Sequence, residues 1–87
     1  MKSLNERARL AFSELKKIGA PVLHFGEGYG GNGLFAISAE MNDDELWADM
    51  YFEGFDFGVN PIIESILEKY GLFCEWYNPG VLDVYED

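Results

Sequence analysis

Residues 60–86, NPIIESILEKYGLFCEWYNPGVLDVYE, decide the fold of this chain because they carry the start and stop signals of consecutive elements. Asn60 followed by Pro61 predicts a helix start, since asparagine caps free amides and proline fits the first helical position. Gly71 is typical of a helix end. The apolar residues between these signals lie on one helical face and are Ile62, Ile63, Ile66, Leu67 and Tyr70. We therefore expect a helix between Asn60 and Gly71.

Two strands are expected after this helix, over residues 72–77 and 81–86. They flank Asn78-Pro79-Gly80, and proline followed by glycine at the centre of a turn is typical of type II. The chain is therefore predicted to end in a β-hairpin or a slightly longer connection.

The N-terminal segment predicts a second helix, over residues 4–18. Ser3 and Glu6 have the spacing of a capping box, in which each residue binds a free amide of the first turn. Gly19 and Pro21 then prevent the helix from continuing. Its apolar face consists of Leu4, Ala8, Ala11, Leu15 and Ile18.

Between the helices, residues 22–25 and 34–40 are short apolar runs that predict strands. Residues 26–33 hold five glycines in eight positions, so we expect a loop there. Residues 53–59 are expected to form another loop.

Residues 46–52 predict a half-buried strand because apolar and polar positions alternate along them. A helix capped by Asn42 or Asp43 is the alternative, but the aromatic content favours a strand. The expected inward residues are Leu46, Ala48, Met50 and Phe52, and the expected outward residues are Trp47, Asp49, Tyr51 and Glu53.

These elements give the order α-β-β-β-α-β-β over a single acidic domain, residues 1–87. Amphipathic helices need an apolar surface to cover, and an antiparallel sheet supplies one. The predicted fold is therefore α+β: a two-layer sandwich whose two helices cover one face of the sheet. The opposite face would carry acids among aromatics, namely Glu40, Asp49, Glu75 and Asp83.

Charge is distributed unevenly along the chain, whose formal net charge is −10. Residues 1–17 contain five bases and two acids, whereas residues 18–87 contain one base and fourteen acids. Such a body repels nucleic acid and anionic membranes and attracts basic surfaces. The expected partner is therefore a basic protein surface, with no nucleic acid and no membrane.

Cytoplasmic localisation is expected from the cysteine usage and the N-terminal sequence. Cys74 is the single cysteine, so no internal disulfide forms. The first residues turn polar after Met-Lys-Ser-Leu and contain no apolar leader segment.

No motif for catalysis, a cofactor or a metal is recognised. The glycine stretch 26–33 has no lysine and no following helix, both of which a phosphate-binding loop needs. The acidic cluster 42–45 lacks the ligand spacing of a calcium loop. His24 and Cys74 are the only imidazole and thiol, and nothing orients them as a nucleophilic pair. We therefore expect a protein that is not an enzyme.

The segment from Asp43 to Phe57 is the predicted partner-binding site, because acids and aromatics interleave along it. On a strand, acids two residues apart would lie about 6.5–7 Å apart, which resembles the spacing of backbone phosphates. The alternative is that the aromatics are core and the acids only keep the domain soluble. The residues expected to contact the partner are Tyr29, Asp43, Asp44, Glu45, Trp47, Asp49, Tyr51, Glu53 and Asp56.

Residues 28–38, GYGGNGLFAIS, are similar to a hairpin in one family of small anti-CRISPR proteins that inhibit Cas9. The similarity covers this short, glycine-rich stretch and transfers no functional residue.

The expected function is that of a non-enzymatic, acidic, protein-binding domain. Its concrete form would be a DNA-mimic inhibitor of a basic nucleic-acid-binding protein, as anti-restriction and anti-CRISPR proteins are. One alternative is an immunity protein or antitoxin against a basic toxin. Another is a housekeeping domain that acts through a homodimer formed by an exposed edge strand.

Overall fold

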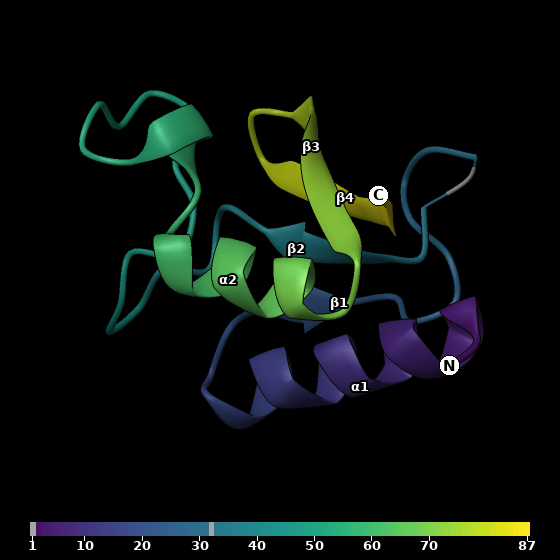
Figure 1. Ribbon diagram of the computed structural model, residues 1–87. Coiled ribbons are helices and arrows are strands. Elements are labelled where there is room, and N and C mark those ends of the chain that lie inside the picture. The colour runs from purple at the N-terminus through teal and green to yellow at the C-terminus, as the bar shows by residue number, and fades with distance from the viewer. Residues whose placement is uncertain (1, 32) are drawn as a thin grey trace.

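The computed structural model describes residues 2–31 and 33–87. Within these residues the chain forms two α-helices and a four-stranded antiparallel sheet, so the predicted α+β class is confirmed. Both helices lie on the same side of the sheet (Figure 1). The elements are α1 (Leu4–Lys17), β1 (Val22–Leu23), β2 (Phe35–Ser38), the short 3-10 helix η1 (Asp56–Gly58), α2 (Pro61–Lys69), β3 (Leu72–Asn78) and β4 (Val81–Glu86).

The sheet has the strand order β1-β2-β4-β3, which places β1 and β3 at its edges. The hairpin β3–β4 pairs Phe73 with Tyr85 and Glu75 with Asp83, and a bulge interrupts the pairing between Trp76 and Asn78. The predicted closing hairpin is therefore present.

Local capping explains why the two helices begin where the sequence predicted. The Ser3 hydroxyl accepts a hydrogen bond from the Glu6 amide at 3.2 Å. The Asn60 side-chain oxygen accepts one from the Ile62 amide at 2.9 Å. These bonds satisfy donors that the first helical turn leaves without a partner.

The hydrophobic core lies between the helices and the sheet. Helix α1 contributes Leu15 and helix α2 contributes Ile63 and Leu67, all almost fully buried. The strand residues that meet them are Phe35, Ile37, Leu82 and Val84.

Two basic residues hold the helices together. The Arg7 guanidinium donates to the Tyr70 carbonyl at 3.0 Å and to the Glu86 carboxylate at 2.7 Å. The Lys69 ammonium binds the Glu14 carboxylate at 2.7 Å. These are the two ion pairs in the described residues, so part of the basic charge serves the fold.

The order α-β-β-β-α-β-β is present, but the third β segment is a single bridge between Ala48 and Val59. The prediction of a regular strand over residues 46–52 is wrong. Burial does not alternate along it: Trp47 and Ala48 are both buried, whereas Tyr51 and Phe52 are both exposed.

Two asparagine side chains explain why residues 46–52 do not extend. The Asn42 oxygen accepts from the Trp47 amide at 2.9 Å, and its nitrogen donates to the Ala48 carbonyl at 3.2 Å. The Asn60 nitrogen donates to the Leu46 carbonyl at 3.0 Å. Backbone groups that a strand would pair with a neighbour are thus satisfied by side chains, and the chain folds as a loop.

Candidate functional site

The glycine stretch is organised around a buried carboxylate. Asp83 is fully buried and accepts hydrogen bonds from the Tyr29 amide at 2.8 Å and the Gly30 amide at 2.6 Å. A side chain at Gly28 would collide with this carboxylate, since its Cβ would lie 2.7 Å from the Asp83 Oδ1 atom. The two amides that could bind an external anion are therefore already bound to the protein itself.

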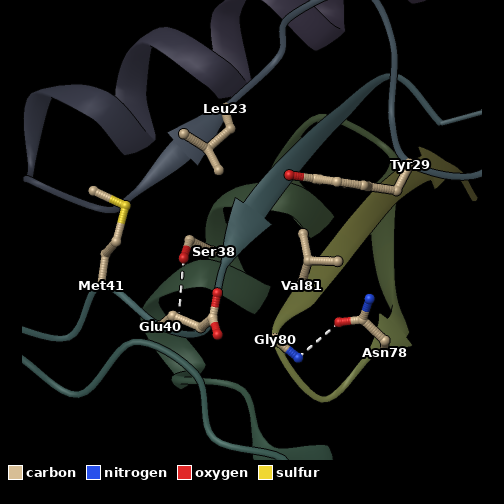
Figure 2. A pocket seen from close by; sticks show the side chains of 8 residues that line it. All are labelled: Leu23, Tyr29, Ser38, Glu40, Met41, Asn78, Gly80 and Val81. Carbon is tan, nitrogen blue, oxygen red and sulfur yellow. Dashed lines mark hydrogen bonds between the residues drawn. The ribbon is translucent and has the colours of Figure 1, made fainter.

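The face of the sheet opposite the helices carries an open hollow of about 440 Å³ (Figure 2). Tyr29 extends across this face from the glycine stretch. The Ser38 hydroxyl accepts from the Glu40 amide at 3.0 Å, and the Asn78 oxygen accepts from the Gly80 amide at 2.8 Å. The side chains of Ser38 and Asn78 are therefore engaged in local turns.

His24 and Cys74 lie on opposite edge strands of the sheet or directly beyond them. His24 is exposed, and its ring nitrogen lies 3.3 Å from the Tyr29 hydroxyl. Burial raises the pKa of the Cys74 thiol to about 12, so the thiol is protonated at neutral pH. The structure does not bring these two residues together.

The predicted site is divided into separate parts. Asp43, Asp44 and Glu45 are exposed on a loop beside Ile18, which follows α1. Trp47 is 7% exposed and belongs to the core, so its predicted outward position is wrong.

A second part, the acidic–aromatic lobe, comprises residues 50–58 and contains η1. Three of its aromatic side chains are exposed: Tyr51 by 77%, Phe57 by 67% and Phe52 by 40%. Its carboxylates Glu53 and Asp56 are exposed as well. The lobe thus presents apolar rings and negative charge together to solvent.

Asp49 holds a local turn at the start of the lobe. It is half-buried, and its carboxylate accepts a hydrogen bond from the Tyr51 amide at 3.0 Å. Asp49 lies outside the sheet, so its predicted place on the open sheet face is wrong. Two other acids predicted for that face, Glu75 and Asp83, do lie in the sheet and are opposite each other on β3 and β4. The Trp76 indole donates to the Phe57 carbonyl at 2.7 Å and ties the lobe to β3.

Sequence reasoning missed a groove between α2 and the outer edge of β3. The groove has a volume of about 260 Å³ and begins at Phe57 of the lobe. Two carboxylates one helical turn apart, Glu64 and Glu68, line it, and this spacing was the available signal. Its other lining residues are Leu67, Leu72, Phe73, Cys74 and Asp87.

The electrostatic field at this groove is negative. Partial burial raises the pKa of the Glu64 carboxyl, and the charges of Asp56 and Glu68 raise it further. No lysine or arginine occurs in the sequence between Lys17 and Lys69, and Lys69 is paired with Glu14. A cation placed beside Glu64 would relieve this repulsion.

The structure also changes the basis of the phosphate-mimicry hypothesis. The regular spacing of acids required an extended strand, and residues 43–58 contain only one bridge residue and the short η1. The acids are therefore displayed on two loops, not along one straight row.

The chain matches no protein-family model, no curated protein and no solved structure. Among the described residues, no helix has both the length and the apolar character needed to cross a membrane. In the same residues, no group of three or more histidine, cysteine or acidic side chains is placed to hold a metal ion.

Proposed function

We propose that this chain is a non-enzymatic binding domain whose acidic–aromatic lobe engages a basic protein surface. The observation that supports this most directly is the exposure of Tyr51, Phe52 and Phe57 beside Glu53 and Asp56. Exposed aromatics supply the apolar contact area of protein interfaces, and unpaired charges of one sign attract a surface of the opposite sign.

Binding of a basic partner by the lobe would be favourable because the lobe has exposed apolar rings and carboxylates without ion-pair partners among the described residues. Tyr51 is 77% exposed and contributes little to the core, so its apolar ring is available for burial against a partner. The lobe carboxylates have no ion-pair partner among the described residues. Their attraction to a basic partner would raise the association rate and would weaken with salt.

The specific partner class that we propose is a nucleic-acid-binding protein, inhibited by occupation of its basic surface. Such a surface has evolved to bind phosphates and is strongly positive. The net charge of −10 makes this chain a competitor for it. We place this activity in the cytoplasm, where the single cysteine, buried at Cys74, stays reduced.

The test is capture of partners from a host lysate on the tagged protein, followed by binding kinetics with the purified partner. We expect a basic protein that binds nucleic acid to be retained and to lose its nucleic acid in competition. The variant Glu53→Lys with Asp56→Lys should slow association by about tenfold or more, because it reverses the local field.

A control variant matches the charge of this double reversal at exposed positions outside the lobe: Asn5→Lys, Ser13→Lys and Glu27→Lys. It raises the net charge by the same four units and should keep most of the association rate. Equal binding by the wild type and the lobe variant would refute the proposal. Equal loss in both variants would show that only overall charge matters, which would also refute a role for the lobe.

A further inference from the structure

The outer edge of β3 is open to another strand. β3 lies at the end of the sheet order and pairs only with β4 (Figure 1). Within residues 2–31 and 33–87, the main chain of Leu72–Tyr77 makes no backbone hydrogen bond outside this pairing. An edge strand presents alternate amide and carbonyl groups outward, and these groups can pair with an incoming strand.

This edge lacks most of the devices that block such pairing. Residues 72–76 contain no proline and no lysine, and the bulge occurs only beyond Trp76. The regular part of the strand is therefore long enough for a short segment to add to the sheet.

The groove beside this edge determines which segment would fit. Glu64 and Glu68 line it from α2 and Asp87 lines it from the chain end, while Phe57 and Phe73 supply aromatic surface. None of the described residues that line the groove is basic. An added strand would project every second side chain into it, so basic side chains at alternate positions would meet these carboxylates.

A second copy of this chain fits the edge poorly. Each copy carries a net charge of −10, and β3 itself presents the exposed Glu75. Two such edges would bring carboxylates against carboxylates, which opposes pairing. Charge complementarity therefore favours a basic segment over self-association.

We propose that the free edge of β3 receives an extended, basic segment of the partner, which adds to the sheet as a fifth strand beside the groove. This proposal rests on the proposed function, because it specifies how the same basic partner is held. Main-chain hydrogen bonds would supply affinity, and Glu64 and Glu68 would select lysine or arginine at alternate positions. The lobe and the groove meet at Phe57, so both surfaces can contact one partner.

The probe is an acetylated and amidated peptide of sequence Lys-Val-Lys-Val-Lys-Val, titrated into the protein and followed by NMR and amide hydrogen exchange. We expect the exchange of alternate amides in Leu72–Trp76 to slow by about tenfold or more, as new hydrogen bonds form. A second peptide with the same sequence, N-methylated at alternate residues, keeps the charge but loses the donors. It should bind about tenfold more weakly.

A pair of protein variants tests the contribution of the groove. Glu64→Gln with Glu68→Gln should weaken binding of the unmodified peptide several-fold, because it removes two charges that face the added strand. Glu6→Gln with Glu27→Gln removes the same charge elsewhere and should leave the affinity within twofold; glutamine at position 6 preserves the capping box.

Several results would overturn strand addition. One is equal affinity of the methylated and unmodified peptides, and another is slowed exchange that is confined to the lobe. A third is concentration-dependent protection of β3 in the protein alone, which would identify a second copy as the occupant. If a basic partner is captured from lysate while β3 stays unprotected, the inference fails and the proposed function stands.

Discussion

The glycine stretch and the acidic–aromatic lobe are both irregular segments beside the sheet, yet the carboxylate that the glycine stretch binds and the carboxylates that the lobe carries behave in opposite ways. At the glycine stretch, the Asp83 carboxylate of β4 is fully buried and accepts hydrogen bonds from two backbone amides at 2.8 and 2.6 Å. In the lobe, Glu53 and Asp56 are exposed, and they have no ion-pair partner among the described residues. A carboxylate of β4 thus holds the glycine stretch closed, whereas the lobe presents its own carboxylates to solvent.

This difference shows that a conspicuous sequence motif, here the glycine stretch, can serve the fold and not a ligand. The glycines permit close approach of the backbone to Asp83, which uses up the amides that a ligand would need. The lobe carries no recognised motif, but it keeps its aromatic and acidic groups free. The exposure of the carboxylates and the hydrogen bonds that they accept distinguish the two regions better than amino-acid composition does.

The largest effect that would test this comparison is expected for Asp83→Ala. The substitution removes two charge-assisted hydrogen bonds inside a buried site, so unfolding should become easier by about 3 kcal/mol or more. Asp56→Ala removes an exposed carboxylate and should change stability by less than about 0.5 kcal/mol. Urea denaturation followed by circular dichroism measures both. Similar costs for the two variants would show that burial does not separate the regions.

Within the lobe, adjacent substitutions should act in opposite directions. Phe57 and Gly58 both have left-handed backbones, with φ of 63° and 74°. Phe57→Gly removes about 1–2 kcal/mol of conformational strain, because glycine adopts the left-handed region without a steric penalty. Glycine also makes the unfolded chain more flexible, which offsets part of this gain, so stability should stay unchanged or rise slightly. Gly58→Ala should cost about 1–2 kcal/mol or more, because the backbone of Asp49 and Met50 blocks its Cβ.

Thermal melts of these two variants would measure the contrast. A clear loss of stability in Phe57→Gly would mean that this exposed ring supports the fold. Phe57 would then be a structural residue, and its availability to a partner would be contradicted.

The smallest effect is expected for Glu64→Gln and depends on pH. Because the folded state raises the pKa of this carboxyl, it holds the proton more tightly than the unfolded chain does. Ionisation of Glu64 therefore lowers stability as the pH rises above 4.5, its ordinary pKa. The glutamine variant should be more stable than the wild type at neutral pH, and this advantage should vanish below that pKa.

Melting temperatures of Glu64→Gln and the wild type across acidic and neutral pH provide the measurement. Adding Asp56→Asn to both proteins should shrink the difference between them, since Asp56 contributes to the raised pKa. A glutamine variant that is less stable at neutral pH would contradict a negative field at the groove.

The helices and the hairpin could be predicted because their signals are local. The Asn60 cap binds an amide two residues away, and the Ser3 cap binds one three residues away. The side of the helices on which the core forms also followed from periodicity, as the burial of Leu15 and Ile63 confirms. Ile18 and Ile62, which the periodicity placed on the same faces, are exposed by 43% and 48%, so that part of the prediction is wrong. The exposed acids at 43–45, 53 and 56 could be named as well, since charged side chains rarely enter a core without partners.

The wrong part of the site prediction, a strand over residues 46–52, depended on residues outside that segment. The alternation of residues 46–52 predicts a strand only if a neighbouring strand is present to pair with it. Asn42 and Asn60 take those backbone groups instead, and Trp47 turns into the core as a result. The groove with Glu64 and Glu68 was missed because α2 and β3 form it together.

By itself, the sequence determined the α+β class, the limits of both helices, the closing hairpin and the acidic character of the surface, because each depends on neighbouring residues or on composition alone. Only the tertiary structure decided which acids are free. Asp83 and the Tyr29 amide lie 54 residues apart in the sequence, yet their contact converts a glycine stretch into a closed loop. Such long-range contacts depend on how strands pair and pack, and no local pattern specifies them.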